Sequence, residues 1–128
     1  MANLIVLDSC VVLDFLAGMR HADTTEKIIR SGRGAVSAIT VYELFNGVSD
    51  PKQLEQRSTL LSFVQVIAID QAVARLAAGI CTSLKAANAL IPHEDMLLAA
   101  GCVHNKLPLF TTNTRDFERI EGLTLYSP

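Results

Sequence analysis

The stretch Asn3-Leu4-Ile5-Val6-Leu7-Asp8-Ser9-Cys10-Val11-Val12-Leu13 decides the fold. Up to Leu7 it is an apolar run rich in strand formers, which is typical of a strand buried on both faces. The residues after Asp8 are helix-like, with Ser9 as the predicted N-cap. Asp8 is therefore expected at the carboxyl end of the first strand of an open α/β sheet, the edge where such sheets bind ligands.

Composition predicts one domain spanning residues 1–128. Half of the residues are hydrophobic and Trp is absent, a composition that suits helices packed on a parallel sheet better than a β-sandwich. The net charge of −2 argues against broad electrostatic binding of nucleic acid. It leaves open a nucleic-acid enzyme whose positive charge is brought by metal ions.

The cysteines and the N-terminal segment indicate a cytoplasmic protein. Cys10, Cys81 and Cys102 lie far apart in apolar helical contexts, which favours reduced core thiols over zinc ligands or disulfides. The apolar run before Asp8 is short and no basic segment precedes it. We therefore expect neither a signal peptide nor a transmembrane span.

Hydrophobic periodicity predicts alternating strands and helices. Besides the first strand, the strand candidates are residues 35–37, a buried run at 66–69, 107–110 and an edge strand at 123–126. The helix candidates are residues 9–17, 21–31 and 39–45, a helix from 50–51, a long helix capped by Asp70, an almost wholly buried helix at 96–103 and a short one at 115–120. This order predicts a mainly parallel sheet with helices on both faces.

Four acidic residues lie in unusual surroundings for a charge: Asp8, Glu43, Asp95 and Asp116 follow buried strands or sit beside apolar helical residues. A carboxylate among buried residues needs a partner or a cation. Arg115 is the only basic residue in these four stretches.

Each acid also has a structural alternative, which is helix capping or a favourable interaction with a helix N-terminus. The alternatives are a cap of the first helix for Asp8, a capping box of Thr40 with Glu43, a near capping box of Asn113 with Asp116, and the N-terminus of its own helix for Asp95. Taken singly, these roles compete with a functional one.

Taken together, the acids indicate a metal site. Carboxylates held at one end of a sheet repel one another and raise one another's pKa. Mg²⁺ or Mn²⁺ relieves that repulsion, since both prefer oxygen ligands and keep bound waters. Such a site can deprotonate a water and stabilise displacement at a phosphodiester. No nucleophile elbow and no phosphate-binding Gly-rich loop is present as a rival.

Four segments of the chain resemble, in order, the motifs of PIN-domain ribonucleases. They are Leu7–Asp14, Ser37–Leu44, Asp95–Ala100 and Phe110–Phe117. The resemblance covers essentially the whole chain, and the small size is most like the VapC toxins of VapBC toxin–antitoxin pairs. Cys10 stands where relatives often have Asn or Ser.

The resemblance implies a three-layer α/β/α fold with a central mainly parallel sheet, and an endoribonuclease that uses Mg²⁺ or Mn²⁺. It further implies a type II toxin that forms homodimers and binds a cognate antitoxin covering the active site. The catalytic, metal-ligating role is carried onto Asp8, Glu43, Asp95 and Asp116. Ser9, Thr112, Asn113 and Arg115 become candidates for supporting the site or contacting RNA, and in some relatives the fourth acid falls at the position of Asn113.

Two other functions remain open at this point. A PIN-like protein could act in RNA processing, or it could be a non-catalytic module for protein contacts. A phosphotransfer receiver and an aspartyl-phosphate phosphatase fit poorly, because the phosphatase needs a second Asp where this chain has Cys10. The RNA target is not encoded in any motif, since RNA is recognised largely by shape and by splayed bases.

Overall fold

The computed structural model describes residues 3–128 and centres on a parallel sheet. Its four strands lie in the order β3-β2-β1-β4, and each neighbouring pair is parallel. The strands are β1 (Ile5–Leu7), β2 (Gly34–Ser37), β3 (Gln65–Ile67) and β4 (Leu109–Phe110). The predicted parallel sheet is confirmed.

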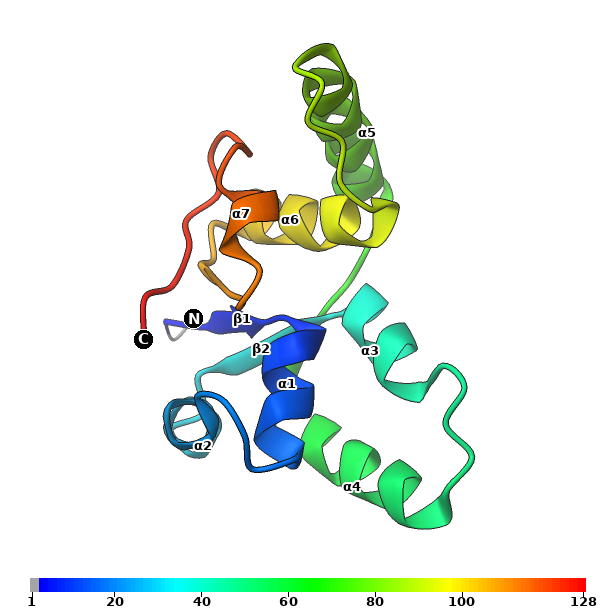
Figure 1. The fold of residues 1–128 in the computed structure, drawn as a ribbon, viewed down its shortest axis with the longest axis vertical. Helices are drawn as coiled ribbons and strands as arrows, with labels where there is room; N and C mark the ends of the chain where they lie inside the picture. The colour runs from blue at the N-terminus through cyan, green and yellow to red at the C-terminus, as the bar shows by residue number, and fades with distance from the viewer. Residues whose placement is uncertain (1–2) are drawn as a thin grey trace.

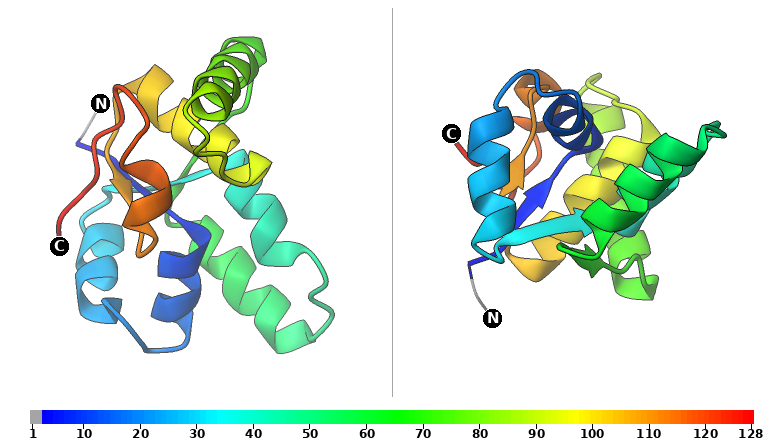
Figure 2. Two further views of the ribbon diagram at one scale, coloured as in Figure 1. Left: turned by 45° about the horizontal axis from the view of Figure 1, so that its top comes forward. Right: turned by 90° about the horizontal axis from the view of Figure 1, so that it is seen from below.

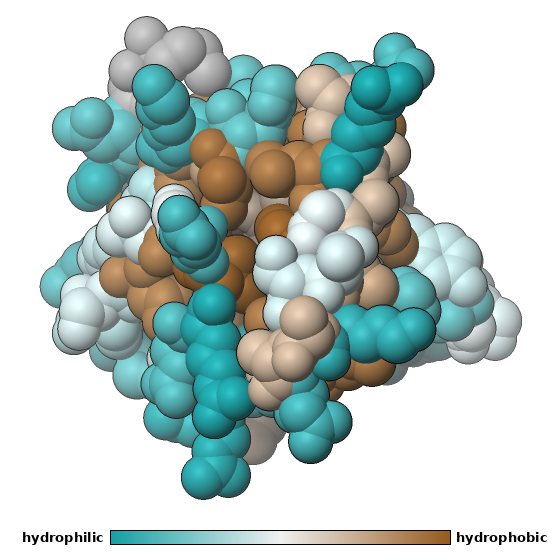
Figure 3. All heavy atoms as spheres, turned by 90° about the horizontal axis from the view of Figure 1, so that it is seen from above, coloured by the Kyte–Doolittle hydropathy of each residue, from teal (hydrophilic) through white to brown (hydrophobic). Residues whose placement is uncertain are grey.

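Helices cover both faces of the sheet, so the predicted three-layer arrangement is also confirmed (Figures 1 and 2). One face carries α1 (Ser9–Leu16), α2 (Ala22–Arg30), α3 (Ala38–Phe45) and α4 (Pro51–Leu61). The other face carries α5 (Gln71–Ala86), α6 (His93–Asn105) and α7 (Thr114–Phe117). The surface on the α5–α7 side has hydrophobic side chains at its centre with strongly hydrophilic ones around them (Figure 3).

The alternation of side chains along β1 builds two separate cores. Ile5 and Leu7 pack with residues of α1 to α4, whereas Val6 packs with residues of α5 to α7. Successive side chains of a strand point to opposite faces, and both faces here are covered. β1 is therefore apolar at every position, as expected for a central parallel strand.

Two predicted helix starts were wrong in detail. The N-cap of α1 is Asp8, whose carboxylate accepts the backbone N–H of Ser9, so Ser9 is the first helical residue instead of the cap. The N-cap of α3 is Ser37, whose hydroxyl accepts the N–H of Ile39. Thr40 lies inside α3, and the capping box with Glu43 does not form. Each cap is a polar residue at the strand–helix junction, Asp8 directly after β1 and Ser37 as the last residue of β2, because each strand runs into its helix without a loop.

The third and last strand candidates also differ from expectation. β3 is exposed rather than buried, with Val66 48% accessible, because it lies at the edge of the sheet and pairs only with β2. Residues 123–126 form a single parallel bridge, between Leu109 and Leu125, rather than a strand. The short helix near the C-terminus begins earlier than expected and is only the four-residue α7. None of the helices within residues 3–128 is both long and apolar enough to cross a membrane.

The longest helix begins as predicted at Asp70, which offers a test of the fold. Its Oδ1 accepts the backbone N–H of Val73 at 3.0 Å. We expect Asp70→Ala to lower the free energy of unfolding by about 1 kcal/mol, because it removes an N-cap. Urea denaturation measures this loss. Asp70→Ser, which keeps a capping oxygen, should recover most of it; equal stability of the Ala variant and the parent would show that the cap contributes nothing.

Candidate functional site

Asp8 is a buried carboxylate held by its own helix and by a distant loop. It is only 6% exposed and stands between the end of β1 and the start of α1. Its Oδ1 accepts the Ser9 N–H at 2.7 Å, and its Oδ2 accepts the Thr111 hydroxyl, also at 2.7 Å. The carboxylate therefore has a fixed orientation at the carboxyl edge of the sheet.

Thr111 contacts Asp8 but was not among the predicted site residues, although it lies within the segment Phe110–Phe117. β1 pairs with β4 in the register Val6 to Leu109 and Leu7 to Phe110, so the residues that follow these strands are neighbours. The Thr111 hydroxyl donates to Asp8 and accepts the backbone N–H of Asn113 at 3.0 Å. Its position directly after a buried strand, like that of Asp8, is the signal that could have revealed it.

Glu43 reaches the same region from α3, which continues directly from β2. Burial raises the pKa of its carboxyl above the ordinary value, and the negative charge of Asp8 raises it further. The nearby Ser9 hydroxyl acts in the opposite direction, and Glu94 adds a small further rise. The charge of Asp8 therefore acts on the Glu43 carboxyl, although Asp8 lies at the start of α1 and Glu43 lies within α3.

The carboxyl of Asp95 is affected by the negative charges of all the neighbouring acids. Asp95 lies in the first turn of α6, and burial together with the negative charges around it raises the pKa of its carboxyl to about 6. Burial is the largest cause, followed by the charges of Asp8, Glu43, Asp116 and Glu94 in that order. The structure therefore brings all four predicted acids into one electrostatic neighbourhood, with Glu94 at its margin.

Asp116 is the most weakly coupled of the four predicted acids. It sits in α7 and accepts the side-chain N–H of Asn113 at 2.9 Å. Its influence on the pKa of Asp95 is smaller than those of Asp8 and Glu43. Asp116 and Asn113, which the motif left as alternatives for the fourth position, are thus hydrogen-bonded neighbours.

The remaining predicted residues surround these acids unequally. The Thr112 hydroxyl donates to the Cys10 sulfur at 3.2 Å, and the Cys10 thiol lies 3.5 Å from Asp8 Oδ2. Thr112 therefore acts on the site only through Cys10. Arg115 is exposed and forms no ion pair with any described residue.

The carboxylate oxygens of the four acids are the kind of ligand that a hard divalent cation prefers. They do not lie close enough together to bind one ion directly at the same time. Within residues 3–128, no three His, Cys, Asp or Glu side chains converge closely enough to hold an ion together. The one ion pair in that range joins Arg30 to Glu26, so no basic side chain is paired with the acids. Mg²⁺ is usually bound through one or two carboxylates and several waters, which suits oxygen donors spaced in this way.

Comparison with known families agrees with this architecture. Residues 5–123 match the PIN domain, a span that includes every acid described above. The chain belongs to the PIN-domain family. The predicted resemblance is confirmed over nearly the whole sequence.

Named relatives of this PIN domain are ribonucleases. It is 27% identical to "Ribonuclease VapC1" of Methanocaldococcus jannaschii over 95% of this chain and 86% of that protein. It is 28% identical to "Ribonuclease VapC2" of Rickettsia felis over 83% of this chain and 85% of that protein. Its fold matches a chain of DNA-bound VapBC from Salmonella typhimurium with a TM-score of 0.85, at 23% identity and 96% coverage of both chains.

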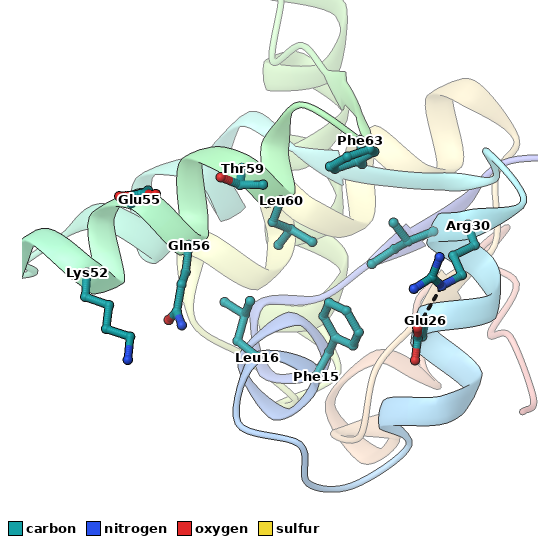
Figure 4. A pocket seen from close by; sticks show the side chains of 11 residues that line it. Phe15, Leu16, Glu26, Arg30, Lys52, Glu55, Gln56, Thr59, Leu60 and Phe63 are labelled. Atoms are coloured by element: carbon teal, nitrogen blue, oxygen red, sulfur yellow. Dashed lines mark hydrogen bonds and ion pairs between the residues drawn. The ribbon is translucent and has the colours of Figure 1, made fainter.

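The PIN domain also has an apolar groove (Figure 4), and none of the four predicted site acids lines it. Its volume is about 690 Å³, and α1, α2 and α4 form its walls. Phe15, Leu16, Ile29, Leu60 and Phe63 line its apolar part, and charged side chains including the Glu26–Arg30 pair lie at its margin. Phe63 is 64% exposed and adds an aromatic side chain to this apolar part of the groove.

The raised pKa of Asp95 predicts how the metal-free protein responds to pH. The unfolded chain releases this proton near its ordinary value of 3.8, whereas the folded protein holds it until about pH 6. Between these values the folded state binds more protons, so stability falls as the pH rises through this window. Without divalent cations, Asp95→Asn should raise the melting temperature above about pH 6 and change it little near pH 4.

Asp23 provides the control for this measurement, because it is exposed in the first turn of α2 and away from the acid cluster. Asp23→Asn should not reproduce the effect of Asp95→Asn. Identical melting curves for Asp95→Asn and the parent at all pH values would show that the repulsion at Asp95 is not significant.

Proposed function

We propose that this PIN domain is a Mg²⁺- or Mn²⁺-dependent endoribonuclease and the toxin of a type II toxin–antitoxin pair. The observation that carries the proposal is the convergence of four carboxylate charges on Asp95, with no basic side chain among residues 3–128 paired to them. A cluster of like charges is costly unless a cation neutralises it. Similarity to the VapC ribonucleases supports RNA as the substrate.

In this proposal Asp8, Glu43, Asp95 and Asp116 hold the metal, directly or through water. When bound, the metal lowers the pKa of a water and stabilises the charge that develops at a phosphodiester. Hydrogen bonds from Ser9 and Thr111 hold the Asp8 carboxylate in a fixed orientation. One of the proposed ligands is therefore already positioned when the metal binds. Asn113 orients Asp116 by donating to its Oδ2.

The two alternative functions are weaker on the same observations. A module kept only for protein contacts has no use for a repelling acid cluster, which lowers stability at neutral pH. RNA processing uses the same chemistry, and the similarity to VapC proteins and to chains of VapBC complexes favours the toxin role over it.

Asp95 provides the cleanest test of the nuclease, since Asp8 also caps α1 and its loss would perturb the fold. Asp95→Asn should lower Mg²⁺- or Mn²⁺-dependent cleavage of RNA by more than about 100-fold. Replacing a residue that only hydrogen-bonds a metal ligand already lowers activity about 10- to 100-fold, and Asp95 is proposed as a ligand itself. A fluorogenic RNA assay on purified protein measures this, with circular dichroism as the check on folding.

Asp14→Asn is the matched control, because Asp14 lies on α1 and contributes to neither the Glu43 nor the Asp95 pKa shift. It should cleave RNA like the parent. If Asp95→Asn cuts RNA as fast as the parent and Asp14→Asn, the proposed site is wrong.

The proposed partner is an antitoxin. We propose that a segment of the antitoxin binds in the groove between α1, α2 and α4. Structures similar to this chain are of VapBC complexes. The groove is the larger of the two cavities described in this structure, and its wall exposes the ring of Phe63. Exposed aromatic side chains of this kind are typical anchors in protein interfaces.

Phe63→Ala should weaken binding of the cognate antitoxin by about 30-fold or more, as expected for an interface anchor. Isothermal titration with the purified pair measures the affinity, and Met19→Ala, which removes another exposed hydrophobic side chain outside the groove, is the control. Equal losses for both variants, or none for Phe63→Ala, would place the partner elsewhere.

Self-association belongs to the same proposal. We propose that the toxin is a homodimer, in line with its family. Sedimentation equilibrium of the isolated chain gives the mass of the particle directly, and a monomer at all concentrations would refute the homodimer while leaving the nuclease proposal intact.

A further inference from the structure

A second cavity opens beside the acid cluster. Its volume is about 410 Å³, and it lies between residues 89–91 and α7 with the turn that follows α7. Ala89, Leu90 and Ile91 form one wall, and Arg115, Asp116, Glu118 and Arg119 form the other. This volume is within the range of ordinary small-ligand sites.

The position of the cavity ties it to the candidate active site. Asp116 lines the cavity and also contributes to the raised pKa of Asp95. Residues 89–91 are followed by Pro92, the N-cap of α6, and the first turn of α6 holds Asp95. One wall of the cavity therefore leads into the helix that carries Asp95, and the other wall includes Asp116 itself.

The two arginines in this cavity have no partner in the described structure. Arg115 and Arg119 are both exposed, and neither side chain forms an ion pair or hydrogen bond with a residue in the range 3–128. Glu118 and Asp116 share the lining, but Asp116 is hydrogen-bonded to Asn113 instead. Free guanidinium groups are suited to bidentate contacts with phosphate.

The opposite wall has the complementary property. It is apolar, and the Leu90 side chain is 57% exposed. Bases of single-stranded RNA bind proteins by placing their faces on apolar or aromatic side chains while basic groups contact the backbone. The cavity has one apolar wall and one charged wall, in which Arg115 and Arg119 lie beside Asp116 and Glu118. The apolar wall matches a base, and the two guanidinium groups match a phosphate.

We propose that this cavity binds one nucleotide of the RNA substrate, adjacent to the phosphodiester that is cleaved. Arg115 and Arg119 contact its phosphate, and Leu90 packs against its base. The inference rests on the proposed nuclease function and adds to it a substrate-binding subsite. An acidic segment of a partner protein matches the arginines but leaves the apolar wall unused, so RNA is the better match.

The test separates binding from chemistry. In an Asp95→Asn background, fluorescence anisotropy with a short, labelled, single-stranded oligoribonucleotide of mixed sequence measures affinity. Arg115→Gln and Arg119→Gln should each weaken binding about tenfold at low salt, as for a hydrogen bond to a charged group. Each should also reduce the slope of log affinity against log salt by about 0.7.

Leu90→Ala should weaken binding about three- to tenfold with no change in salt slope, since its contact is apolar. Arg20→Gln, which removes an exposed arginine beyond the far end of α1, should leave affinity and slope unchanged. In the active protein, the Gln variants should raise KM for RNA and keep kcat within about twofold, because they alter substrate binding rather than the acids.

The outcomes distinguish the inference from the function on which it rests. Loss of cleavage in Asp95→Asn, together with RNA affinities of the arginine variants equal to that of Arg20→Gln, overturns the subsite and leaves the nuclease standing. If the arginine variants weaken binding of the antitoxin but not of RNA, the cavity binds the antitoxin and the nucleotide subsite is refuted. Cleavage that survives in Asp95→Asn refutes the nuclease site itself.

Discussion

The parallel pairing of β1 with β4 is the contact on which the candidate site depends. It places residue 8 beside residue 111 and turns both chain segments toward the same edge of the sheet. The Thr111 hydroxyl then fixes one oxygen of Asp8, while the helix that follows Asp8 fixes the other. Because β1 is buried on both faces by two cores, this arrangement cannot shift without disturbing most of the packing.

Around that fixed carboxylate the fold gathers charges that repel one another. Glu43, Asp95 and Asp116 come from three different helices, so no local conformational change can separate them all. Burial raises the pKa of the Glu43 and Asp95 carboxyls, and the repulsion between the acids raises both further. A divalent ion removes this repulsion, which means that metal binding and conformational stability are expected to be coupled in this protein.

Much of this could be predicted from residues that act locally. Asp70 caps its helix as expected, and the apolar run before Asp8 forms a buried central strand, because capping and burial depend on nearby residues. The four acids could be proposed as site residues from the sequence because a charge in an apolar stretch is conspicuous. Thr111 was missed, since its role depends on a register between strands about one hundred residues apart. The exposure of β3 was missed for a related reason: hydrophobicity does not reveal which strand lies at the edge of the sheet.

The position of α1 has a consequence for inhibition. Its N-terminus is capped by Asp8, and its last turn supplies Phe15 and Leu16 to the apolar groove. Eight helical residues span about 12 Å, so a molecule seated only in the groove leaves the acids open to solvent. An effective inhibitor would need two parts, an anchor in the groove and an extension that reaches along α1 to the carboxylates. Without the extension, the molecule would still bind in the groove but would no longer block access to the carboxylates.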